Sequence, residues 1–177
     1  MKTLKLATIA LLFFSLISMF PGLSSANTKF KDVTSKNDFY NETNYLTGKG
    51  IISGYNDGTF KPGNNLTRAQ AAKMLVTATN KQDIAQPNLS FKDVDPTNQA
   101  EQYKYISRAV SLGYFKAGTD NRFKPNEEIN RDEMGYALSI AFKLTEKITA
   151  SKPLAFPDMK RHKYAEQING LYYAGVT

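Results

Sequence analysis

Two arginines at matching positions have the type and spacing that favour binding of an anion. Arg68 and Arg131 each lie 18 positions after a glycine, Gly50 and Gly113. Each opens a stretch with helical apolar spacing, so we expect it at the first position of a helix, where free amides and the helix dipole favour an anion. A planar guanidinium adds a fork that suits a carboxylate. The alternative is that both arginines only form salt bridges with a neighbouring acid.

The segments that carry the arginines have strong helix-start signals. Thr67 can cap the first of these helices, and Gln70 can reach back to complete a capping box. Asn130 and Glu133 occupy the same two places before and after Arg131. Apolar residues continue along one face of each predicted helix and are expected to form the core: Ala71, Leu75, Ala78, Met134, Leu138 and Phe142.

The arginine segments belong to a longer unit that recurs along the chain. The sequence Phe-Lys-Asp-Val at residues 30–33 recurs at residues 91–94, and a looser copy stands at residues 156–159. Each copy leads through a helix-like stretch to a glycine, where the helix is expected to stop in the left-handed conformation. We therefore expect a mainly α protein of tandem helix-loop-helix repeats. The predicted repeats span residues 30–80, 91–145 and 156–177.

The third predicted repeat is incomplete in this sequence. It stops at Thr177, just past its glycine, Gly175, so it lacks the loop, the second helix and the arginine. Between the repeats, residues 80–90 and 145–155 are polar and contain a proline, as linkers commonly do. We expect either a fragment of a longer chain or a truncated form.

The first 26 residues have the pattern of a secretory signal peptide. Lys2 and Lys5 precede an uncharged apolar run at residues 6–20, and small residues at 24–26 form a cleavage site. The alternative is a retained membrane anchor, but the run is short for a spanning helix, which needs about 20 apolar residues. We expect cleavage before Asn27, export, and no membrane association of the remaining chain, which has no second apolar run.

Composition limits the partners of the exported chain. The formal charge is +7, and it falls to +5 when the two lysines of the leader are removed. A positive excess favours an anionic partner, which by charge alone could be a nucleic acid, a glycan or a membrane surface. Export argues against a nucleic acid. The chain has no cysteine, so core packing alone must hold it, which fits an exported Gram-positive protein.

The sequence gives little support for catalysis or metal binding. His162 is the only histidine, and there is no cysteine to form a zinc or nucleophile site with it. Glu127 and Glu128 are adjacent in a predicted loop. The segment around Asp57-Gly58 predicts a tight turn and lacks the acidic spacing of a calcium loop. We expect no catalytic residue, no metal and no cofactor.

Residues 54–62 and 66–70, together with the Phe-x-Asp-Val openings, resemble the S-layer homology repeat, and the resemblance covers residues 30–177. It implies a pseudo-threefold arrangement around a central helical bundle. It also implies non-covalent anchoring at a Gram-positive surface to an anionic secondary cell-wall polysaccharide, often pyruvylated. The alternative is a remnant or fragment of a wall-anchored enzyme or S-layer protein with little binding of its own. We expect a monomer or a part of a longer chain.

The resemblance also implies that ligand-binding residues lie in grooves between the repeats. The aspartates could instead cap a helix or order a turn, and the glycines could serve only as turns. Members of this family often carry a tryptophan early in the first helix; this chain has none, and Phe39 or Tyr164 could take its place as an apolar platform. The predicted polysaccharide-binding residues are Arg68, Arg131, Asp32, Asp93, Asp158, Phe39, Tyr164, Gly50 and Gly113.

Overall fold

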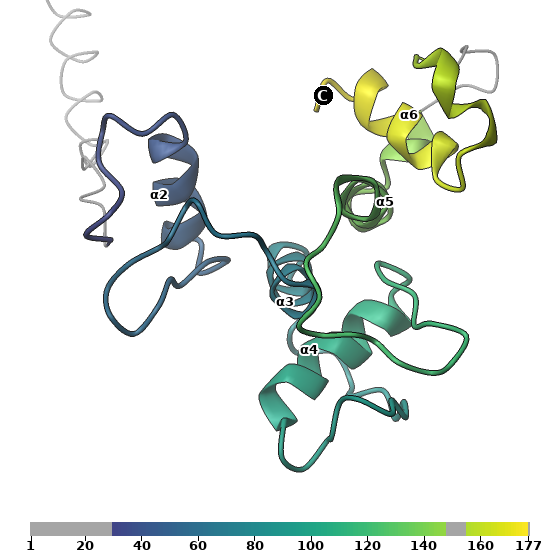
Figure 1. The fold of residues 1–177 in the computed structure, drawn as a ribbon, viewed down its shortest axis with the longest axis horizontal. Helices are drawn as coiled ribbons and strands as arrows, with labels where there is room; N and C mark the ends of the chain where they lie inside the picture. The colour runs from purple at the N-terminus through teal and green to yellow at the C-terminus, as the bar shows by residue number, and fades with distance from the viewer. Residues whose placement is uncertain (1–29, 148–154, 177) are drawn as a thin grey trace, which may run out of the picture. The chain divides into compact units, whose positions relative to one another are not determined.

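The computed structural model describes residues 30–147 and 155–176 (Figure 1). The predicted signal peptide at residues 1–26 lies outside the described residues. The described residues form two compact units. The first unit consists of residues 30–49 and 54–60, and the second consists of residues 50–53, 61–147 and 155–176. Both parts are helical and without strands across the described ranges, which confirms the mainly α class. The described helices include none with the length and apolarity needed to cross a bilayer.

The first unit contains a single helix, α2 (Tyr40–Gly48), and a tight turn. Thr43 is the only buried residue of α2, which agrees with the weak apolar spacing of this segment. The predicted turn is confirmed, since the Gly58 amide donates to the Tyr55 carbonyl at 3.0 Å. Gly54 has a φ of 67°, and a Cβ there would lie 2.2 Å from the Phe30 ring, so no side chain fits.

The second unit holds four helices, α3 (Arg68–Ala78), α4 (Ala100–Ser111), α5 (Arg131–Ala141) and α6 (Ala165–Tyr173). Two short 3-10 helices, Leu144–Lys147 and Pro157–Arg161, accompany α6. α3 packs on α4 and on α5, and α5 packs on α6. The core side chains of this unit are completely or almost completely buried, and the largest include Phe115, Phe123, Ile106, Val76 and Val94.

Two predicted core residues, Ala78 and Phe142, are not in the core cluster. Phe142 is 45% exposed, because α5 ends at Ala141 and Phe142 follows as the C-cap residue. The other apolar residues predicted for the face of α5, Met134 and Leu138, pack against the core although they are only half-buried. The second helices therefore contribute to the core as predicted, except at the C-terminal ends of α3 and α5.

The internal repeat predicted from the sequence is also a repeat of backbone conformation. The offset of 63 residues that separates Arg68 from Arg131 also relates pairs of residues with positive φ. The predicted left-handed stops are confirmed, since Gly50, Gly113 and Gly175 have φ of 69°, 76° and 73°. Beyond the helix stops, the residues with positive φ that the 63-residue offset relates are Gly58 with Asn121, Lys61 with Lys124, and Asn80 with Lys143.

Side chains of α4 hold the segment that joins the first two repeats. Arg108 is 6% exposed, and its Nε and Nη2 atoms both donate to the Ile84 carbonyl, at 3.0 and 2.7 Å. The Tyr103 hydroxyl donates to the Leu89 carbonyl at 2.7 Å and accepts from the Leu89 amide at 3.1 Å. These bonds satisfy backbone groups of the segment and fix its path along α4.

Candidate functional site

Both predicted arginines occupy the first position of a helix, as the capping signals predict. The Thr67 hydroxyl accepts from the Gln70 amide at 3.3 Å, and the Gln70 side chain accepts from the Thr67 amide at 2.9 Å, which confirms the capping box. In the second copy the Asn130 side chain accepts from the Glu133 amide at 2.8 Å. Arg68 and Arg131 thus begin α3 and α5, and the N-cap residues before them, Thr67 and Asn130, both have an extended backbone.

The two helix N-termini differ in the state of their first amides. At α3, the Arg68 amide donates to the Glu127 carbonyl at 2.9 Å, and the Ala69 amide donates to the Pro125 carbonyl at 3.0 Å. The segment that leads into α5 therefore covers the start of α3. At α5, the amides of Arg131 and Asp132 have no acceptor among the residues that the structure describes. Among the described residues, the first amides of α5 therefore have no acceptor, whereas those of α3 do.

The Arg68 side chain is enclosed by the second repeat. Its Nε donates to the Phe123 carbonyl at 2.8 Å and its Nη2 donates to the Lys116 carbonyl at 3.2 Å. Its Nη1 forms an ion pair with the Glu133 carboxylate. The guanidinium also lies over two aromatic rings, 4.7 Å from the centre of Phe123 and 5.6 Å from that of Phe115. Arg68 therefore forms the salt bridge that was the alternative to ligand contact.

Arg68 is shielded from solvent. The residue is 8% exposed, and this burial lowers the pKa of its guanidinium, while the negative charge of Glu127 acts in the opposite direction. Arginine stays protonated in proteins, so the Glu133 carboxylate faces a permanent charge. The capping pattern of the sequence predicts only a helix-cap role for Glu133. In the structure its carboxylate binds Arg68 instead, which joins the start of α3 to the start of α5.

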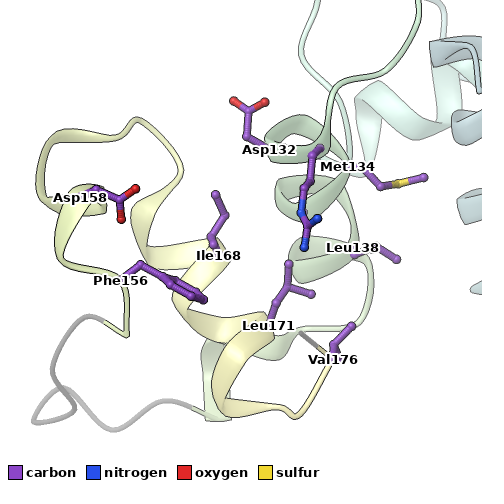
Figure 2. Close-up of a pocket in the computed structure, with 10 residues that line it drawn as sticks. Asp132, Met134, Leu138, Phe156, Asp158, Ile168, Leu171 and Val176 are labelled. Carbon is purple, nitrogen blue, oxygen red and sulfur yellow. The ribbon is translucent and has the colours of Figure 1, made fainter. Parts of the chain in front are cut away.

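Arg131 has the opposite environment. Its side chain is exposed, and it makes no hydrogen bond or ion pair with any residue described by the structure. It lines a cleft of about 600 Å³ between α5 and the third repeat. Figure 2 shows Phe156, Ile168 and Leu171 facing α5 across this cleft, with Asp158 and Asp132 near its rim. The cleft thus combines an apolar floor, two carboxylates and a guanidinium that is unpaired among the described residues.

Aromatic and charged side chains continue this surface beyond the cleft. The Tyr164 and Tyr136 ring centres are 4.7 Å apart, and the Lys163 ammonium lies 4.5 Å from the centre of the Tyr164 ring. His162 Nε2 lies 3.5 Å from an Asp132 carboxylate oxygen, while His162 Nδ1 accepts from the Tyr164 amide at 3.2 Å. Tyr164, predicted as a sugar platform, is therefore half-buried and packed against α5 through Tyr136.

The three predicted aspartates fall into two groups. Asp32 accepts from the Phe60 amide at 2.8 Å. Asp93 accepts from the equivalent Phe123 amide at 2.9 Å and from the Lys124 amide at 2.7 Å. These two carboxylates order the loop of their own repeat, which is one of the roles open to them from the sequence. Asp158 is exposed and lines the cleft beside Arg131.

An Asp93→Ala variant is expected to lose about 1–3 kcal/mol of folding stability, because two backbone amides lose their acceptor and Phe123 is fully buried. Asp93→Asn retains one carbonyl oxygen and is expected to lose less. Urea denaturation followed by circular dichroism gives both differences. Equal stability of Asp93→Ala and the parent protein would show that the carboxylate does not order this loop.

The remaining predicted residues lie elsewhere. Phe39 precedes α2 in the first unit and is 73% exposed. Gly50 and Gly113 follow the C-caps of α2 and α4, with positive φ. Of the nine predicted site residues, Arg131 and Asp158 line one common cleft. The described residues contain no group of three histidine, aspartate or glutamate side chains that could hold a metal ion.

Comparison with known proteins agrees with the repeat pattern. The family model of the S-layer homology domain matches residues 29–72 and 90–134. The chain is 31% identical over 156 residues to an S-layer protein of Bacillus thuringiensis subsp. finitimus, which covers 88% of this chain and 19% of the relative. The S-layer protein sap of Bacillus anthracis gives the same identity and coverage.

A third relative is named as an enzyme and not as an S-layer protein. An uncharacterized cell wall amidase of Bacillus anthracis is 31% identical over 134 residues, which cover 76% of this chain and 24% of the amidase. The chain spans about a fifth of the length of these curated relatives. The family match at two successive copies, each containing one of the two equivalent arginines, settles the classification. This chain belongs to the S-layer homology domain family.

Proposed function

We propose that this chain anchors non-covalently to the bacterial cell wall by binding an anionic secondary cell-wall polysaccharide, whose acidic group is a pyruvyl ketal. Membership of the S-layer homology family supports wall anchoring in general. The names of the relatives, S-layer proteins and a cell wall amidase of Bacillus, support a location at the surface of a Gram-positive bacterium. Export through the predicted signal peptide at residues 1–26 belongs to the same proposal.

The observation that carries the proposal is Arg131 at the start of α5 beside an apolar cleft, where it makes no hydrogen bond or ion pair with the part of the chain that the structure describes. A pyruvyl ketal has a carboxylate and a methyl group on one carbon. The carboxylate would accept hydrogen bonds from the Arg131 guanidinium and from the first amides of α5. The methyl group would contact the apolar floor at Ile168 and Leu171, and the Asp158 carboxylate would accept from sugar hydroxyls.

The other predicted residues have different roles in this proposal. All the donors of Arg68 that the structure describes are directed to the second repeat, so ligand contact there would break the pair with Glu133. We therefore place ligand contact at Arg131 and treat Arg68, Asp32 and Asp93 as residues that hold the repeats in shape. Phe39, with its large exposed face, and Tyr164 beside Lys163 are proposed as platforms for sugar rings.

We propose no catalytic role for the chain itself. His162 is the only histidine of the chain, and its two ring nitrogens face Asp132 and the Tyr164 amide. A protein named as an uncharacterized cell wall amidase occurs among the relatives, but the matched segment is only 24% of its length. Zymography on wall material tests this point, since a cleared band would contradict it.

The test of the proposed function is co-sedimentation of the chain with purified wall sacculi, before and after extraction of the secondary polysaccharide. Binding is expected to untreated sacculi and to be lost after extraction. Chemical removal of the pyruvyl groups is expected to have the same effect while leaving the sugar backbone intact. Equal binding to extracted sacculi would instead indicate peptidoglycan or nonspecific charge, and absence of binding would favour a remnant without function.

A further inference from the structure

The C-terminal ends of α3, α4 and α5 enclose a second cleft, of about 640 Å³. It lies at the opposite end of α5 from Arg131, and eleven residues at a rise of about 1.5 Å per residue place the two ends about 15 Å apart. The residues that matter for its chemistry are Thr79, Lys81, Tyr114, Ser139 and Phe142. Its volume is in the usual range for small-molecule sites, about 300–1,000 Å³.

The hydroxyl of Ser139 has no evident role in the packing of this cleft. The residue is completely buried, and its hydroxyl has no hydrogen-bond partner among the described residues. Buried hydroxyls are almost always paired, so an unpaired one that lines a cleft points to a missing partner. Its equivalent in α3, 63 positions earlier, is Val76, which is also completely buried. The repeat thus accepts an apolar side chain at this position and does not need the hydroxyl for packing.

The neighbouring groups add polar and apolar surfaces around Ser139. The Tyr114 hydroxyl donates to the Thr79 hydroxyl at 3.0 Å, and Thr79 in turn donates to the Leu75 carbonyl at 2.8 Å. The Tyr114 oxygen therefore retains capacity to accept one more hydrogen bond. Phe142, which is 45% exposed, supplies an aromatic face, and the exposed Lys81 supplies a positive charge at the rim.

We propose that this second cleft binds a pyranose ring that carries an acid group. The apolar face of the ring would lie on Phe142, a ring hydroxyl would bond Ser139 and Tyr114, and the acid would lie near Lys81. The proposal rests on the proposed function for the source of the ligand, a wall glycan, and on the cleft for the chemistry. A second site about 15 Å from the first along α5 would let one chain hold two sugars, which raises the overall affinity without new contacts at either site.

The test is a titration of the ¹⁵N-labelled full chain with D-glucuronate, followed by amide chemical shifts. Shifts are expected at residues 139–143 and at residues 79–81. Cyclohexanecarboxylate, which has the same ring size and charge but no hydroxyls, is the matched control and is expected to shift them far less. Ser139→Val copies the residue that α3 has at this place and is expected to weaken glucuronate binding about fivefold, the effect of one lost hydrogen bond.

Three results would overturn the proposal. They are no glucuronate shifts in the cleft, equal shifts with cyclohexanecarboxylate, and unchanged affinity in a folded Ser139→Val protein, which would mean that Ser139 bonds only water. If Ser139→Val does not fold, Ser139→Ala removes the same hydroxyl without adding volume. Arg131→Ala is expected to leave glucuronate binding at this cleft unchanged, so failure here is distinguishable from failure of the Arg131 site.

Discussion

Replacement of Arg68 by alanine is expected to lower the free energy of unfolding by about 3–5 kcal/mol. The Glu133 carboxylate, whose side chain is 15% exposed in the intact protein, would lose its charged partner. The carbonyls of Phe123 and Lys116 would lose a donor, and the two aromatic rings would lose the stacked guanidinium. Removing one member of a buried ion pair leaves an uncompensated charge, which is the costly case.

The chain supplies its own control for this prediction. Arg131 occupies the equivalent position of α5 but is exposed and unpaired among the described residues, so Arg131→Ala is expected to change stability by less than about 0.5 kcal/mol. Urea denaturation of both variants gives the comparison. A double-mutant cycle with Glu133→Ala then isolates the energy of the pair, because the two residues are in direct contact. Similar losses in the two arginine variants would contradict the role given to Arg68.

The helix positions were predictable because their signals are local. Thr67 with Gln70 and Asn130 before Glu133 specify where α3 and α5 begin, and Gly113 specifies where α4 stops. These signals depend on residues three or four positions apart, which the sequence displays directly. The equivalence of the two arginines followed from the repeat. Their different environments did not, because they depend on residues from another repeat.

The partners of Arg68 illustrate what local patterns miss. Glu133 lies 65 positions away, and its place at the third position of α5 also fits a helix cap, so the cap was a sufficient explanation. Phe123 and Lys116 contribute carbonyl oxygens, which carry no side-chain signature. A clue was nevertheless present, since Arg68 is followed by Ala69, Ala71 and Ala72, which favour close packing of this helix end, and a buried arginine requires an acid.

The aspartates show a different limit of the sequence. Asp32, Asp93 and Asp158 stand in the same motif, so the motif alone assigns them one common role. In the structure, Asp32 and Asp93 bond the amides that follow their own turn, whereas Asp158 lines the cleft of Arg131. The motif does not identify the partners of the aspartates, because the amides that Asp32 and Asp93 bind lie 28 and 30 residues further along the chain.

Wall binding is expected to depend on Arg131 and much less on the charge of the chain. Arg131→Ala should weaken binding to sacculi about tenfold or more, because a hydrogen bond to a charged group contributes about 1.5–3 kcal/mol and each 1.4 kcal/mol is tenfold in affinity. Arg131→Lys keeps the charge and loses the planar fork, so it should recover only part of the binding. Binding isotherms from co-sedimentation measure all three proteins.

The control for net charge is Arg122→Ala. Arg122 is about half-exposed and pairs only weakly with Asp120, at 3.6 Å, so its loss removes one positive charge without touching the Arg131 cleft. This variant should bind sacculi nearly as well as the parent protein at moderate salt, where exposed charges are screened beyond about 10 Å. If Arg122→Ala and Arg131→Ala weaken binding equally, attraction to the wall is a property of the whole surface. A loss confined to Arg131→Ala places recognition at the N-terminus of α5, because that variant leaves the folded repeats and nearly all of the positive charge in place.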